Sequence, residues 1–156
     1  MTLVSKTRAS MRGKTVVITG GTSGIGEVSA VALAKMGARI ILVARDKARG
    51  DATLARLRDS APGIAHNVYF ADLLRLAEMK RVADQIAEQV SRIDVLINNA
   101  GALFATRRLT EDGLERTFAL NHGLFPADPS IARPPDGACP AHRQYGVGRP
   151  SGGPTV

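Results

Sequence analysis

The sequence predicts an α/β protein in which a doubly wound parallel sheet carries helices on both faces. Short apolar runs alternate with longer segments of helical period, which is typical of strand–helix–strand units with right-handed crossovers. The run at residues 39–44 contains an unbroken series of Ile, Leu and Val, as expected for a parallel strand buried on both faces. Four such strands fit the order 3-2-1-4 of a partial Rossmann fold.

Each expected element has local evidence. The expected strands cover about residues 15–19, 39–44, 67–71 and 93–97. The expected helices cover about residues 24–36, 46–59, 74–90 and 110–120. Gly37 follows the first helix where a left-handed cap is common, and Pro62 and Gly63 follow the second. Apolar residues recur at spacings of three and four in the third helix, and Glu111 and Asp112 suit the start of the fourth.

The composition describes an ordinary globular domain. Hydrophobic residues make up 44% of the chain and charged residues 22%, and no apolar run approaches the ~20 residues that span a bilayer. Cys139 is the single cysteine, which excludes an internal disulfide and a cysteine-cluster metal site. The three histidines share no metal-ligand spacing. We therefore expect a cytoplasmic protein with no secretory signal, no membrane span and no metal.

The net charge of +7 raises the question of nucleic-acid binding. The arginines are scattered along the predicted helices, and the few aromatic residues show no pattern that would stack on bases. We expect these arginines to lie on solvated helix faces and expect no nucleic-acid partner. The positive field would still favour a phosphate-rich ligand.

A glycine-rich turn joins the first expected strand to the first expected helix. It reads Thr19-Gly20-Gly21-Thr22-Ser23-Gly24-Ile25-Gly26. Glycine lets the chain turn tightly and lets backbone N–H groups approach a pyrophosphate, whose charge the positive end of the helix dipole favours. In this strand–turn–helix context the motif predicts a dinucleotide-phosphate site.

Three further motifs follow the later elements. They are Asp72-Leu73 after the third strand, Asn98-Asn99-Ala100-Gly101 after the fourth, and Asn121-His122 at the end of the last helix. Together with the glycine-rich turn they resemble, in identity and spacing, the short-chain dehydrogenase/reductase family. Residues 43–46 and 98–121 resemble its retinol-dehydrogenase-like branch. The resemblance covers about residues 12–122.

The resemblance implies an oxidoreductase that transfers hydride between NADP and an alcohol or carbonyl substrate, a small lipophilic one in the intact family member. The residues that it implies at the cofactor are Gly20, Thr22, Ser23, Gly24, Ile25, Gly26, Arg45, Asp72, Leu73, Asn98, Ala100 and Gly101. Asp72 would lie at the adenine ring, Asn98 and Asn99 would hold the end of the fourth strand, and Asn121 would be the active-site asparagine. From the residues alone, Asp72 could also cap the following helix, and the two asparagines could be turn residues.

The choice between NADP and NAD depends on the end of the second strand. Arg45 offers a planar cationic fork that suits a 2′-phosphate and therefore favours NADP. Asp46 lies one residue later, and a carboxylate at this place would accept hydrogen bonds from the 2′-hydroxyl of NAD. NAD therefore stays open as the alternative.

The character of the chain changes at Asn121. Seven of the eight prolines lie in residues 122–156, and no period of 2 or 3.6 is sustained there. We therefore divide the chain into an N-terminal extension at 1–12, a dinucleotide-binding portion at 13–121 and an irregular Pro/Gly-rich tail at 122–156.

The resemblance also implies catalytic residues that this chain lacks. The family uses a serine, a tyrosine and a lysine one helical turn after the tyrosine, since a tyrosine with a pKa of about 10 is a poor base at neutral pH. No lysine follows Lys80. Tyr145 and Arg149 imitate the spacing, but Gly146 and Gly148 oppose a helix between them. We expect cofactor binding without catalysis; the alternative is a non-catalytic dinucleotide-binding or regulatory module.

A frameshift hypothesis accounts for the missing catalytic half. When the codons of residues 141–148 are read one nucleotide later, the genetic code permits Arg-Ile-Val-Asn-Met-Val-Ser over the first seven. This series resembles the fifth strand of the family. The shift would lie near residues 122–126, so that the family pattern is truncated after about Asn121. A naturally short protein with a proline-rich tail is the alternative.

Overall fold

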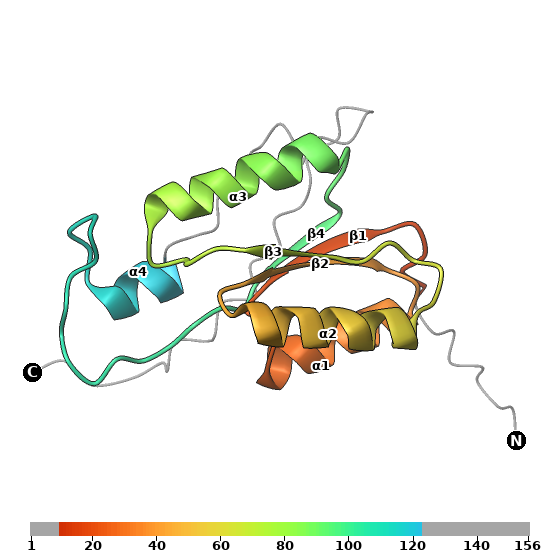
Figure 1. Ribbon diagram of the computed structural model, residues 1–156, viewed down its shortest axis with the longest axis horizontal. Coiled ribbons are helices and arrows are strands. Elements are labelled where there is room, and N and C mark those ends of the chain that lie inside the picture. Colours follow the sequence, from red (N-terminus) through yellow and green to blue (C-terminus); the bar gives the residue numbers. More distant parts are fainter. Residues whose placement is uncertain (1–9, 123–156) are drawn as a thin grey trace, which may run out of the picture.

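The computed structural model describes residues 10–122, so the extension up to residue 9 and the tail from residue 123 lie outside the described residues. The strands are β1 (Thr15–Thr19), β2 (Arg39–Ala44), β3 (Asn67–Phe70) and β4 (Val95–Asn98). The helices are α1 (Gly24–Lys35), α2 (Lys47–Ser60), α3 (Leu76–Gln89) and α4 (Arg116–His122). All four strands are parallel in the order β3-β2-β1-β4, which confirms the predicted fold class (Figure 1).

Helices cover both faces of the sheet: α3 lies on one face, and α1 and α2 lie on the other (Figure 1). Successive residues of β1 and β2 point to opposite faces, so that each face has its own apolar cluster. The cluster under α3 includes Val17, Ile41, Val43, Met79, Val82 and Ile86. The cluster under α1 and α2 includes Val16, Ile18, Ile40, Leu42, Ala30, Ala34 and Leu57. Burial of each large aliphatic side chain stabilises the fold by about 1.5–3 kcal/mol.

The last helix is shorter than predicted. The sequence predicts a helix over residues 110–120, but α4 begins only after Glu115. Gly113 adopts a φ of +76°, a left-handed conformation that interrupts a helix. The Glu115 carboxylate marks the true start, since it accepts the backbone N–H groups of Thr117 at 3.0 Å and of Phe118 at 2.9 Å. These two bonds hold the pKa of Glu115 below its usual value.

Glu111 and Asp112 support α3 instead of α4. Asp112 Oδ2 accepts the backbone N–H of Leu76 at 3.0 Å, and Glu111 pairs with Nη2 of Arg75 at 2.8 Å. The helix predicted from residue 74 therefore begins at Leu76, where a carboxylate from a distant segment accepts its first N–H group. The predicted bounds of β1 and β2 agree with the observed ones, and, α4 apart, the remaining bounds differ by at most two residues.

The buried carboxylate of Asp94 joins the start of β4 to β1. It accepts the backbone N–H of Thr15 at 2.9 Å and pairs with Lys14 at 3.1 Å and Arg92 at 2.7 Å. Burial alone would raise the pKa of Asp94, but these partners hold it below its usual value. This end of the sheet therefore carries a fixed ion cluster, while the opposite end carries the candidate site.

Candidate cofactor site

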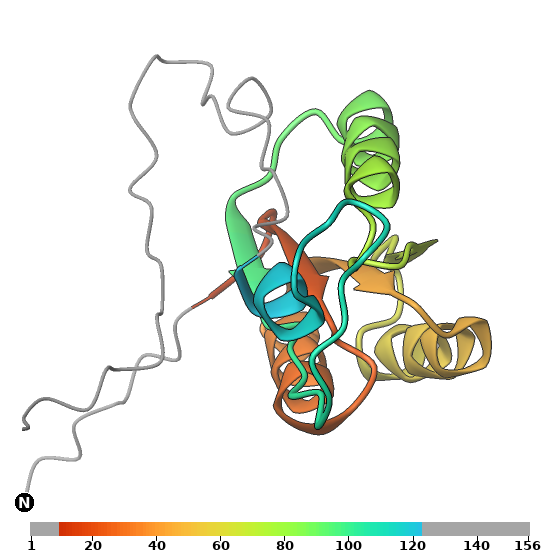
Figure 2. The same ribbon diagram turned by 90° about the vertical axis from the view of Figure 1, so that its left-hand side faces the viewer.

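The carboxyl ends of the strands bring the predicted site residues to one edge of the sheet. Figure 2 shows this edge, with α4 and the loop before it in front of the strands. Gly20 follows β1, Arg45 follows β2, and Asp72 and Ala100 come two residues after β3 and β4. Open parallel sheets bind ligands in the crevice outside the carboxyl ends of their strands.

The glycine-rich turn is crowded against the segment after β4. Gly20 has a φ of +66°, and a Cβ atom there would lie 2.7 Å from Cα of Ala100. A Cβ atom on Gly26 would lie 2.6 Å from the carbonyl oxygen of Gly20 and against Nδ2 of Asn99. Gly24 has a φ of +53° with open space around it. A side chain at Gly20 or Gly26 would therefore push the turn out of place.

Thr19 and Asn99 lock this turn to the end of β4. The Thr19 hydroxyl accepts the backbone N–H groups of Asn99 and Ala100, both at 3.1 Å. Asn99 Nδ2 in return donates to the carbonyl oxygens of Thr19 at 3.2 Å and Gly20 at 3.0 Å. Asn98 is exposed and takes no part in this lock. From the sequence, Thr19 is only the first residue of the glycine-rich turn and has no assigned role; the available signal is a hydroxyl residue at the carboxyl end of a buried strand.

The first turn of α1 offers backbone donors to a ligand. The first N–H groups of a helix have no partner within it, and in α1 they belong to Gly24, Ile25 and Gly26. Ser23 is the N-cap residue, but its side chain makes no capping bond. Ser23 and Gly24 are exposed, Ile25 is 81% exposed, and Thr22 is half-buried. This donor set, at the positive end of the helix dipole, fits a pyrophosphate.

Arg45 and Asp46 differ in what their side chains do. Arg45 is exposed, and among residues 10–122 its guanidinium makes no hydrogen bond or ion pair. Asp46 is the N-cap of α2, and its Oδ1 accepts the backbone N–H of Arg49 at 2.8 Å. The Asp46 carboxylate is therefore engaged by its own helix.

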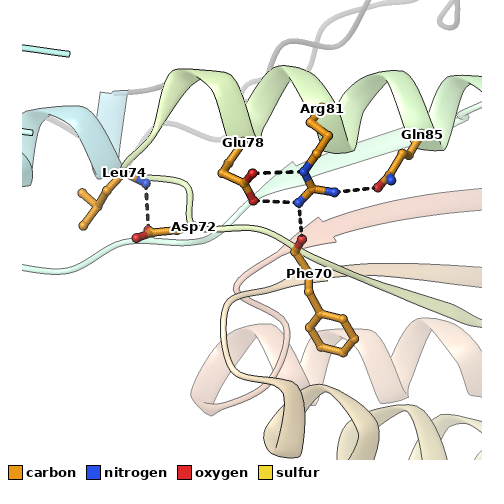
Figure 3. A network of polar contacts seen from close by, with 6 residues as sticks. All are labelled: Phe70, Asp72, Leu74, Glu78, Arg81 and Gln85. Atoms are coloured by element: carbon orange, nitrogen blue, oxygen red, sulfur yellow. Dashed lines mark hydrogen bonds and ion pairs between the residues drawn. The ribbon is translucent and has the colours of Figure 1, made fainter. Parts of the chain in front are cut away.

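Asp72 and Leu73 offer different groups to a ligand. Leu73 is only 9% exposed and packs in the cluster under α3, so it can offer a ligand its backbone but not its side chain. Asp72 is half-buried, and its Oδ1 accepts the N–H of Leu74 at 3.0 Å (Figure 3). The possibility that Asp72 caps α3 is wrong, because the first N–H group of that helix binds Asp112.

Asn121 fixes the loop that follows the Asn-Asn-Ala-Gly motif. Its Nδ2 donates to the carbonyl oxygens of Ala102 at 2.8 Å and Thr117 at 2.7 Å. A Cβ atom on Gly101 would lie 2.5 Å from Asn121 Oδ1, so the loop and α4 touch here. The structure thus brings Asn121 next to Gly101 at the predicted site.

Among the described residues we find neither a metal site nor a membrane-spanning helix. Residues 10–122 contain no group of three or more histidine, cysteine, aspartate or glutamate side chains that could hold a metal ion. None of the helices described there has the length and apolar character needed to cross a bilayer.

Comparisons with known proteins agree with this geometry. A family model described as short chain dehydrogenase matches residues 14–125. Human retinol dehydrogenase 13 is 38% identical to this chain over 115 residues, which cover 74% of this chain and 35% of that protein. The chain thus spans about a third of the length of that curated relative.

Solved structures show the same similarity. A short-chain dehydrogenase from Sphingobium yanoikuyae in complex with NADPH is 44% identical with a TM-score of 0.61, over 70% of this chain and 43% of that chain. The NADH-dependent reductase A1-R′ complexed with NAD is 33% identical with a TM-score of 0.62, over 78% of this chain and 51% of that chain.

Proposed function

This chain belongs to the short-chain dehydrogenase family, and from that premise we propose that residues 13–121 form the cofactor-binding portion of an NAD(P)-dependent oxidoreductase. The observation that carries the proposal is the crowding of Gly20 and Gly26 against the segment after β4. Because glycine has no side chain, the turn can pack this closely and still present its backbone next to the first N–H groups of α1, as a bound pyrophosphate requires. A bound dinucleotide would supply the hydride acceptor or donor of the reaction.

Each candidate residue has a proposed part in holding the dinucleotide. Thr22, Ser23, Gly24, Ile25 and Gly26 surround the pyrophosphate with N–H and hydroxyl donors. The dinucleotide would lie against the backbone of Gly20, Asn98, Ala100 and Gly101, and the lock between Thr19 and Asn99 holds the glycine-rich turn beside the segment after β4. The Asp72 carboxylate and the Leu73 backbone bind the adenine ring, and Asn121 orients the loop beside the nicotinamide end.

The structure favours NADP over NAD at the ribose of the adenosine half. Arg45 is exposed and makes no side-chain bond among the described residues, so that it can pair with a 2′-phosphate. Asp46, the residue that would favour NAD, is held as the N-cap of α2. Relatives of this chain are solved with NADPH and with NAD, so NAD is the second cofactor to test.

The preference can be tested with two variants, one that removes the cation just before α2 and one that removes a cation near the end of α2. Arg45→Ala should weaken NADPH binding about tenfold or more and leave NADH binding nearly unchanged, since a charge-assisted hydrogen bond contributes about 1.5–3 kcal/mol. Arg58→Ala is the matched control, because Arg58 is an exposed cation in the last turn of α2, the helix that follows Arg45. Equal losses for both variants would mean that only the general field attracts the cofactor.

We further propose that this chain binds the dinucleotide without transferring hydride. Support comes from the sequence: no lysine follows Lys80, and Tyr145 and Arg149 only imitate the catalytic pair. The small lipophilic alcohol or carbonyl substrate is assigned to the intact family member alone. Hydride transfer from NADPH to any aldehyde by the purified chain would overturn this proposal.

The origin that we propose for the missing catalytic half is a frameshift near residues 122–126. Sequencing the locus from about codon 115 tests it. An open frame one nucleotide over that encodes a tyrosine followed four residues later by a lysine would support it. A verified frame without such a continuation would leave the non-catalytic binding module as the function.

The composition alone supports two further proposals, one on the cellular compartment and one on nucleic-acid binding. A single cysteine, Cys139, suits the reducing cytoplasm. The scattered arginines suit solvated helix faces, and we propose no nucleic-acid partner. Retention of the chain on a heparin column well above physiological salt would argue for nucleic-acid binding and against this proposal.

A further inference from the structure

Arg81, in the second turn of α3, holds the end of β3 (Figure 3). Its Nη2 donates to the carbonyl oxygen of Phe70 at 2.7 Å. Glu78 orients the same guanidinium through two bonds, from Nε at 3.1 Å and from Nη2 at 2.7 Å, and Gln85 accepts from Nη1 at 2.9 Å. Because a bidentate carboxylate fixes the plane of a guanidinium, the donor that reaches Phe70 is aimed by α3.

The Phe70 carbonyl is part of the peptide between Phe70 and Ala71, which lies at the end of β3 and is still hydrogen-bonded to β2. β3 is an edge strand, and the N–H of the same peptide, carried by Ala71, donates to the carbonyl oxygen of Ala44 in β2 at 3.0 Å. The peptide between Phe70 and Ala71 is therefore held at both ends, by β2 at its N–H and by Arg81 at its carbonyl. Asp72 is the next residue along the chain.

We propose that Arg81 is a positioning residue for Asp72, which sets how the Asp72 carboxylate meets the adenine ring of the cofactor. This inference rests on the proposed function. Asp72 Oδ1 accepts the N–H of Leu74, and within residues 10–122 the other carboxylate oxygen has no partner, so it can serve a ligand. The position of that oxygen depends on the Phe70–Ala71 peptide, whose carbonyl Arg81 holds. Arg81 acts through this peptide and needs no contact with the cofactor.

The chemistry of adenine gives a readout specific to this role. The 6-amino group of adenine donates hydrogen bonds and a carboxylate only accepts them, so the two are complementary. Hypoxanthine carries an oxygen acceptor at the same place, and Asp72 would repel it. The ratio of the dissociation constants of NADPH and its hypoxanthine analogue therefore measures how well Asp72 is placed. Loss of folded protein would change both constants alike and leave the ratio unchanged.

The experiment compares three variants of the full chain with the parent chain. Arg81→Ala removes the hold on Phe70, and Arg81→Lys keeps one donor on a long stem. Lys80→Ala is the matched control, because Lys80 is the neighbouring exposed cation of α3 and pairs with Asp84 four residues later. Fluorescence titration with the two dinucleotides gives the ratio for each protein.

We expect the parent chain to prefer NADPH over the hypoxanthine analogue, and Arg81→Ala to reduce that preference about fivefold or more. Lys80→Ala should keep the full preference, and Arg81→Lys should keep part of it. An unchanged preference in Arg81→Ala, or an equal loss in Lys80→Ala, would overturn the inference while the proposed function stands. A folded parent chain that binds neither dinucleotide would overturn the proposed function itself.

Discussion

Replacement of Thr19 by valine tests the lock between β1 and the segment after β4. Thr19 is 2% exposed, and its hydroxyl is the acceptor for two backbone N–H groups, those of Asn99 and Ala100. Valine keeps the branched shape and the strand preference of threonine but accepts neither hydrogen bond. Thr19→Val therefore removes two hydrogen bonds with little change in packing.

The expected loss follows from the number of donors left without a partner. A buried donor without an acceptor costs about 1–3 kcal/mol, and two are affected. Asn99 and Ala100 are half-buried, so that water reaches them in part, and we expect a total near the lower end, about 2 kcal/mol. Thr19→Ser is the control, because it keeps the hydroxyl and removes one methyl group, with a loss of about 1 kcal/mol.

Urea unfolding measures the free energy of unfolding of both variants, and NADPH titration measures the effect on the cofactor site. Thr19→Val should be the less stable of the two, and its folded fraction should bind NADPH more weakly than Thr19→Ser. If Thr19→Val is as stable as Thr19→Ser, the hydroxyl does not hold the two N–H groups, and the reasoning is refuted.

Three further substitutions test other parts of the molecule. Burial lowers the pKa of His66 below 6.5, so the unfolded chain takes up a proton that the native imidazole does not, and the free energy of unfolding should fall as the pH drops below about 6.5. Urea unfolding of His66→Gln at several pH values should show a weaker dependence on pH, and an unchanged dependence would assign the effect to other residues. Asp46→Asn should keep both the cap of α2 and the affinity for NADH. A tenfold loss of NADH affinity in this variant, measured by titration, would indicate that the Asp46 carboxylate accepts the ribose hydroxyl. Asp112→Ala should lower the free energy of unfolding by about 1 kcal/mol as a lost cap, and Glu111→Ala, which breaks an exposed ion pair, by less than about 0.5 kcal/mol; equal losses would argue against the cap.

The sheet and its order could be predicted because local pattern and burial agree there. Residues 39–44 form a strand with both faces covered, as their uninterrupted aliphatic series requires. The start of α4 could not be predicted in the same way. Glu111 and Asp112 have the composition of a helix start, but their carboxylates bind the beginning of α3, a contact between segments far apart in the sequence. Local preference cannot tell which of two helices an acidic side chain will cap.

In the candidate site, the sequence could indicate the positions where the backbone conformation requires glycine. Gly20 and Gly26 stand where the turn meets another segment too closely for a side chain, and the spacing of the glycines indicates this from the sequence. Thr19 and Arg81 escape such an analysis, because each acts by a hydrogen bond to the backbone of a residue that only the fold brings near. The sequence likewise leaves the choice between Arg45 and Asp46 open, because the bond by which Asp46 caps α2 is visible only in the fold.

Titration of the purified, folded chain with NADPH and NADH under the same conditions decides whether this chain is a dinucleotide-binding protein. The fold and the glycine-rich turn predict saturable binding of both dinucleotides. The exposed Arg45, which has no side-chain partner within residues 10–122, predicts that NADPH binds more tightly. Tighter binding of NADH would contradict the role of Arg45. A folded sample that binds neither dinucleotide would contradict the proposed function.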